Sequence, residues 1–88
     1  MDAATEEGTD RDYVASLARG LSVIRAFRRD RPSMTLSEIA RAADMNRAAA
    51  RRLLITLVRE DYAETDGKYF RLRPRILELG FSALSSLS

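Results

Sequence analysis

Residues 35–52, TLSEIARAADMNRAAARR, have the pattern of two short helices separated by a three-residue turn. The second helix opens with a basic face carried on small side chains, formed by Arg47, Ala48, Arg51 and Arg52. A helix that is slim at its N-terminal end and carries guanidinium groups outward fits the major groove of DNA. This stretch therefore predicts a helix-turn-helix and makes duplex DNA the leading candidate partner.

Both helices of this motif carry signals for where they begin. Thr35 and Glu38 fit a capping box, in which Thr35 caps the first turn and Glu38 reaches back to the Thr35 amide. Asn46 is a favourable N-cap for the next helix, which we expect to run to about residue 61. The inward face of that helix is expected to hold Ala50, Leu53, Leu54, Leu57 and Val58. The start of the first helix, with the Ser37 hydroxyl, is expected to face a phosphate.

The segments on either side complete the predicted fold. Residues 14–30 have apolar residues at helical spacing (Val14, Leu17, Leu21 and Ile24), and Arg31-Pro32 is expected to end that helix. Segments 62–66 and 69–73 are rich in strand-forming residues and meet at Asp66-Gly67, a strong hairpin signal. Pro74 stands where a proline opens a last helix, which is apolar almost all round.

The order helix, helix, helix, strand, strand, helix predicts a mainly α fold with a small β-hairpin, a winged helix-turn-helix. We expect a disordered acidic tail over residues 1–12, the DNA-binding domain over 13–73, and a linker or dimerisation helix over 74–88. The charges agree with this division. Residues 1–12 hold five acids and one base, whereas residues 13–88 hold fourteen bases and eight acids, a balance that favours a polyanion as partner.

The hairpin tip supplies a second candidate contact with DNA. Lys68 and Tyr69 lie there, and they are expected to meet the adjacent minor groove or phosphates. The alternative is a plain surface turn in which Tyr69 packs across the sheet opposite Glu64.

The outer apolar surfaces of the first and last helices are expected to need a partner. Gly80 in the last helix suggests that another helix approaches closely there. A symmetric homodimer would pair these faces and place two recognition helices about 34 Å apart. The alternative is that the same residues pack within one chain. The candidate interface consists of Val23, Phe27, Ile76, Leu79, Gly80, Phe81, Ala83 and Leu84.

Composition argues against enzymatic chemistry. The chain has no cysteine and no histidine, which removes the commonest nucleophile, general base and metal ligands, so neither a metal nor a cofactor is expected. No apolar run approaches the length of a membrane span, and we expect a cytoplasmic protein.

The chain resembles the N-terminal winged helix-turn-helix of the isocitrate lyase regulator (IclR) family of bacterial transcription factors. The resemblance is carried by SLARGLSVIRAF, LSEIARAADMNRAAARRLLITLVREDY, TDGKYFRLRPRILELG and FSALSS. Within the family, RAAARR and TDGKYFRLRPRILELG are most similar to regulators of protocatechuate and hydroxybenzoate catabolism.

The resemblance implies a dimer, or a dimer of dimers, on palindromic promoter sites. It also implies that the last helix leads into an effector-sensing domain that is absent here. The implied DNA contacts are Thr35, Ser37, Asn46, Arg47, Ala48, Arg51, Arg52, Lys68 and Tyr69. Asp44 and Asp61 depart from the family pattern, because each stands where a glycine is usual, and slight backbone strain is expected there.

Two functions of other kinds remain open from the sequence. One is a winged helix that only mediates protein assembly through its apolar outer helices. The other is an RNA-binding winged helix, against which the small number of aromatic residues (three Phe and three Tyr) argues.

Overall fold

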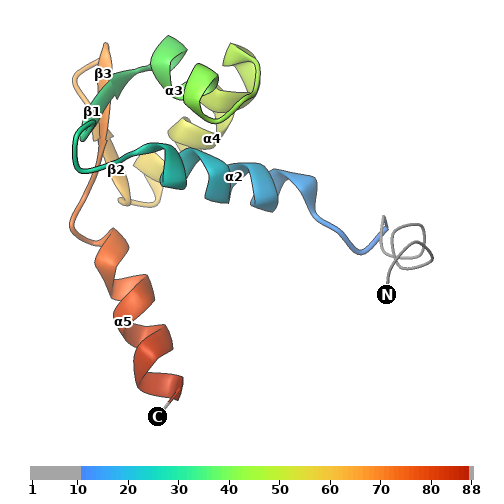
Figure 1. Cartoon of the computed structure of the whole chain (residues 1–88), viewed down its shortest axis with the longest axis vertical. Coiled ribbons are helices and arrows are strands. Elements are labelled where there is room, and N and C mark those ends of the chain that lie inside the picture. Colours follow the sequence, from blue (N-terminus) through green and yellow to red (C-terminus); the bar gives the residue numbers. More distant parts are fainter. Residues whose placement is uncertain (1–10, 88) are drawn as a thin grey trace.

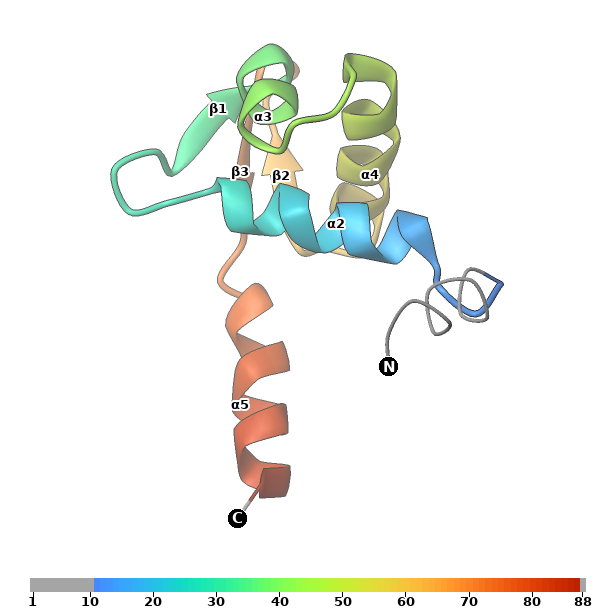
Figure 2. The same cartoon turned by 45° about the vertical axis from the view of Figure 1, so that its right-hand side comes forward.

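The computed structural model describes residues 11–87, so the predicted acidic tail lies outside the described residues except for Arg11 and Asp12. Its helices and strands in chain order are α2 (Ala15–Ala26), β1 (Ser33–Thr35), α3 (Leu36–Ala42), α4 (Arg47–Arg59), β2 (Ala63–Thr65), β3 (Tyr69–Leu72) and α5 (Ile76–Leu87). Helices α2, α3 and α4 pack together with the small sheet along one edge, and α5 projects away from this body (Figures 1 and 2). The predicted winged helix-turn-helix is confirmed.

The capping signals of the helix-turn-helix are present as predicted. The Thr35 Oγ1 atom accepts the Glu38 backbone N–H at 3.2 Å, and a Glu38 carboxylate oxygen accepts the Thr35 N–H at 2.8 Å. The Asn46 Oδ1 atom accepts the Ala49 N–H at 2.8 Å. These local bonds fix where α3 and α4 begin, and thereby the register of the residues that face outward.

The sheet has three strands in the order β1-β3-β2, where the sequence predicts only two. Both neighbours are antiparallel to β3, and β1 aligns Met34 with Phe70 and Thr35 with Tyr69. The strand β1 has three residues and forms only by pairing with β3, far along the chain, so no local alternation announces it. Thr35 therefore ends β1 and also caps α3, which connects the wing directly to the helix-turn-helix.

The core corrects the expected orientation of the first helix. Val23, predicted on an outer surface, is fully buried in one cluster with Met34, Ile39 and Leu54, and Phe27 packs against that cluster. Instead, the side chains that project outward from α2 are Val14, Leu17 and Leu21, which are 59%, 64% and 53% exposed.

The cause is the early end of α2. The backbone becomes extended at Phe27, and Arg28 and Arg31 exchange two backbone hydrogen bonds in a tight turn. The helix therefore ends at Ala26 rather than near residue 30. This turn brings Met34 back to the core, where the last turn of α2 covers it.

The two aspartates that replace the usual glycines both have left-handed backbone. The φ angle is 57° at Asp44 and 68° at Asp61. Each residue follows a helix in a Schellman motif: the Met45 N–H donates to Ala40 O at 3.0 Å, and the Tyr62 N–H donates to Leu57 O at 2.8 Å. The strain expected from the sequence is thus located at the two turns that flank α4.

We expect Asp44→Val to lower the free energy of unfolding by about 1–2 kcal/mol, because a β-branched residue is strongly disfavoured at positive φ. Asp44→Gly relieves the strain but adds freedom to the unfolded chain, so its stability should stay within about 1 kcal/mol of the parent. The Asp44 side chain is exposed, so neither change disturbs the core. Urea unfolding followed by circular dichroism measures both; equal stability of the valine and glycine variants would contradict this account.

Candidate nucleic-acid interface

The helix α4 presents two chemically different faces. Ala50 and Leu54 are buried against the body, whereas Arg47, Arg51 and Arg52 are exposed. Among residues 11–87 the ion pair that forms joins Arg28 to Asp30 at 3.5 Å, so these three arginines are not paired with a described carboxylate. Their guanidinium groups are open to solvent and available to a phosphate or to a base edge.

The leading turn of α4 is slim, as predicted. Ala48 is exposed and Ala49 half-buried, so no large side chain stands between the backbone and a groove edge. Asn46 is committed differently from the implied DNA contact: its Oδ1 atom caps the helix through Ala49. Only its amide N–H donors remain for another partner.

The start of α3 is more crowded than the sequence suggests. Thr35 Oγ1 and the Thr35 N–H are both engaged with Glu38, while the Ser37 side chain is exposed. The Thr35 backbone N–H, with smaller help from Arg31 and Arg41, lowers the pKa of the Glu38 carboxyl. A negative charge already occupies this helix terminus, so Ser37 is the better placed of the two predicted contacts.

The wing tip is held by its own side chains. Asp66 Oδ1 accepts the backbone N–H groups of Lys68 and Tyr69 at 2.9 and 2.8 Å, and these bonds lower the pKa of the Asp66 carboxyl. Gly67 has a φ of 103°, which the turn requires. The Lys68 ammonium lies 5.4 Å from the centre of the Tyr69 ring. The tip thus presents an ordered cation beside an aromatic ring.

The alternative in which Tyr69 packs opposite Glu64 is wrong. The sheet register places Glu64 opposite Arg71 and Tyr69 opposite Thr35. This pairing brings the wing next to the start of α3. Two of the predicted contact regions therefore lie side by side, although they are more than thirty residues apart in the sequence.

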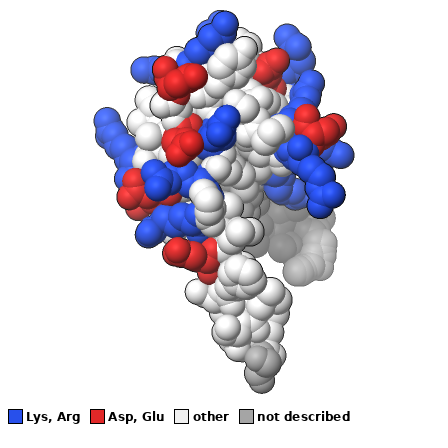
Figure 3. Space-filling view, turned by 90° about the vertical axis from the view of Figure 1, so that its left-hand side faces the viewer, with Lys and Arg blue, Asp and Glu red and all other residues white. Residues whose placement is uncertain are grey.

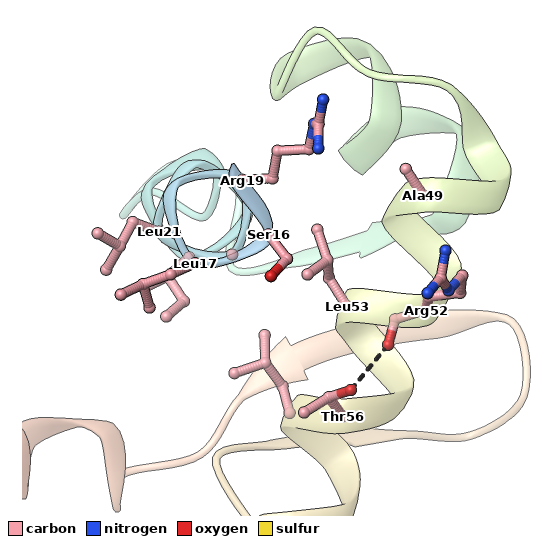
Figure 4. A pocket seen from close by; sticks show the side chains of 11 residues that line it. Ser16, Leu17, Arg19, Leu21, Ala49, Arg52, Leu53 and Thr56 are labelled. Atoms are coloured by element: carbon pink, nitrogen blue, oxygen red, sulfur yellow. Dashed lines mark hydrogen bonds between the residues drawn. The ribbon is translucent and has the colours of Figure 1, made fainter. Parts of the chain in front are cut away.

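A groove of about 510 Å³ between α2 and α4 adds a basic residue that the sequence reasoning missed (Figure 4). Arg19 lies on the α2 wall and Arg52 on the α4 wall, both away from Leu17 and Leu21. Arg19 could have been noticed as the charged residue within an otherwise apolar helix face, but only the packing of α2 shows its position near α4.

The candidate dimer residues of α5 are exposed, as an unpartnered helix requires. Leu79, Phe81 and Leu84 are 52–65% exposed, and Gly80 has nothing within 4 Å of the position of an added Cβ. Ala83 is also exposed, and Ile76 is half-buried at the base of the helix. Basic and acidic side chains are interspersed over the body, whereas α5 below it is white (Figure 3).

Two further classes of site were searched for among residues 11–87. No cluster of carboxylates within this part of the chain is arranged to hold a metal ion. None of its helices combines the length and apolar character needed to cross a membrane.

Residues 16–67 match the IclR helix-turn-helix domain, which is more than half of the chain. The chain belongs to the IclR helix-turn-helix family. It is 44% identical over 77 residues to the Pca regulon regulatory protein of Pseudomonas putida, covering 88% of this chain and 26% of that protein. It is 41% identical over 83 residues to the p-hydroxybenzoate hydroxylase transcriptional activator of Acinetobacter baylyi, covering 94% of this chain and 31% of that protein.

A solved transcriptional regulator from Rhodococcus sp. RHA1 is 60% identical, with a TM-score of 0.79 over 86% of this chain and 30% of that chain. The IclR-family domain described here thus spans about a quarter to a third of the length of these proteins. The relatives are transcriptional regulators and not enzymes, which agrees with the prediction from composition.

The capping box gives the stability of this IclR-family domain a predictable dependence on pH. The folded-state pKa of Glu38 lies below its ordinary value of 4.5, so the stabilisation is complete above that pH and is lost as the pH falls through the folded pKa. We expect Glu38→Gln to flatten the fall in melting temperature below pH 4.5, because the glutamine does not titrate. Thermal unfolding at several pH values tests this.

The matched control is Glu60→Gln, which removes the same charge at the C-terminal end of α4 without touching a cap. If both variants leave the acid profile of the parent unchanged, the Glu38 carboxylate does not contribute as described.

Proposed function

We propose that this domain recognises an operator in double-stranded DNA sequence-specifically, through the N-terminal half of α4 and with support from the wing. The observation that carries the proposal is the exposed, low-bulk basic face of α4, held to the core by its opposite side. Arg51 and Arg52 supply forked donors for guanine or phosphate. Arg47, Lys68 and Tyr69 flank them, and Asn46, Ala48, Thr35 and Ser37 complete the proposed surface.

We further propose that it binds as a homodimer on a palindromic site. The apolar character of α5 supports this, because none of its twelve residues is buried and a helix of that length is marginal in water by itself. The exposed Leu17 and Leu21 of α2 replace Val23 and Phe27 in the proposed apolar surface. Two copies would then present two recognition helices about one turn of DNA apart.

The regulated genes are proposed from the relatives. One is named for p-hydroxybenzoate hydroxylase, and another for the Pca regulon. A role in regulating aromatic-compound catabolism follows for this chain. The small-molecule effector would then act through a domain beyond residue 88.

A module that only mediates assembly is the second candidate, and the unpartnered apolar faces of α2 and α5 favour it. It requires no DNA and predicts that no duplex shifts in an electrophoretic assay. The basic face of α4 has no role in that alternative, which is why we prefer DNA binding.

The decisive residues are tested on an operator recovered from random duplexes with the purified chain. We expect Arg51→Ala or Arg52→Ala to weaken operator binding by about 1–3 kcal/mol, roughly 5- to 150-fold in Kd, because one forked contact to a base is lost. The melting temperature should not change, since both side chains are exposed. Fluorescence anisotropy and thermal unfolding provide the two measurements.

Arg59→Ala is the matched control, because it removes the same charge from the exposed side of the same helix about 12 Å further along. It should weaken the operator and a scrambled duplex equally, whereas the Arg51 and Arg52 variants should reduce the ratio between them. An unchanged ratio in those two variants would refute their assignment as base-reading residues.

A further inference from the structure

The direction of α5 is set by very few contacts. No residue of α5 is buried, and the helix leaves the body in both views of the fold (Figures 1 and 2). The connection from β3 consists of residues 73–75, and Pro74 restricts its backbone. Whatever fixes the helix in space must therefore act at this short joint.

Tyr62 is the residue of the body on which this joint rests. The Arg75 guanidinium lies 5.0 Å above the centre of the Tyr62 ring, and the Arg73 backbone N–H donates to Tyr62 O at 2.9 Å. The Tyr62 side chain raises the pKa of Arg75 further above its ordinary value, through a hydrogen bond and charge interaction. A cation held over a ring and bonded to its hydroxyl has a defined direction, which an isolated stacked contact would lack.

The same tyrosine is bonded to the recognition helix. Its backbone N–H donates to Leu57 O at 2.8 Å and closes the motif that ends α4. Tyr62 thus lies between the last turn of α4 and the first turn of α5. Its half-buried position ties it to the body, while Arg75 belongs to the segment that leads into α5.

We propose that the Arg75–Tyr62 contact is the positioning element that sets the direction of α5 relative to α4. The inference rests on the proposed function, because in a dimer joined through α5 this direction determines the separation of the two recognition helices. Arg75 would then govern which spacing of operator half-sites is bound best. It would have no effect on how one half-site is read.

The test compares Arg75→Ala with Arg75→Lys, which keeps a cation for the ring, and with Arg73→Ala, which removes the neighbouring charge but leaves the backbone bond to Tyr62. Each is titrated with a single half-site duplex and with duplexes whose two half-sites differ in spacing. For Arg75→Ala we expect the preference for the best spacing over the next to fall about two- to fivefold per contact. Half-site affinity should match that of Arg73→Ala, and Arg75→Lys should restore at least part of the preference.

A sharp spacing optimum in Arg75→Ala equal to that of the parent would overturn the inference. Failure of the parent to bind any duplex would instead refute the proposed function, and a second measurement then still tests the joint. Because the chain has no cysteine, spin labels at Ala42→Cys and Ser82→Cys report the distance between α3 and α5 within one chain, diluted with unlabelled protein. The distance distribution should broaden in Arg75→Ala and stay narrow in Arg73→Ala; equal widths would refute the positioning role.

Discussion

The burial of Leu54 and Ala50 beneath α4 determines which side of that helix faces the solvent. Leu54 shares one cluster with Val23, Met34 and Ile39, contributed by three other elements, so the rotation of α4 about its axis is fixed. Truncating such a leucine typically costs about 2–5 kcal/mol, a large part of the stability of so small a domain. With that rotation fixed, Arg47, Arg51 and Arg52 point outward.

The Schellman motifs at Asp44 and Asp61 extend this constraint to the neighbouring elements. The first positions α3 against the start of α4, and the second turns the chain from the end of α4 into the sheet. Each motif places an L-residue at positive φ. The fold therefore tolerates backbone strain at the two points where the direction of the recognition helix is determined.

Local signals account for the parts of the fold that were predictable from the sequence. The caps at Thr35 and Asn46 and the turn at Asp66-Gly67 depend on neighbours within three residues, so their residue types reveal them. The strand β1 and the burial of Val23 depend on partners far along the chain, and the apolar spacing of α2 was compatible with two orientations. At the interface, the arginines of α4 were predictable. The position of Arg19 near α4 and the joint between Tyr62 and Arg75 arise only from packing.

The central claim is that the N-terminal half of α4 meets DNA. Backbone amide chemical shifts of the isotopically labelled chain, followed during titration with the selected operator duplex, test it most directly. The account predicts the largest changes over residues 46–52 and 67–69, with Arg59 and the far end of α5 nearly unaffected. Changes confined to α2 and α5, with the amides of α4 unmoved, would contradict it.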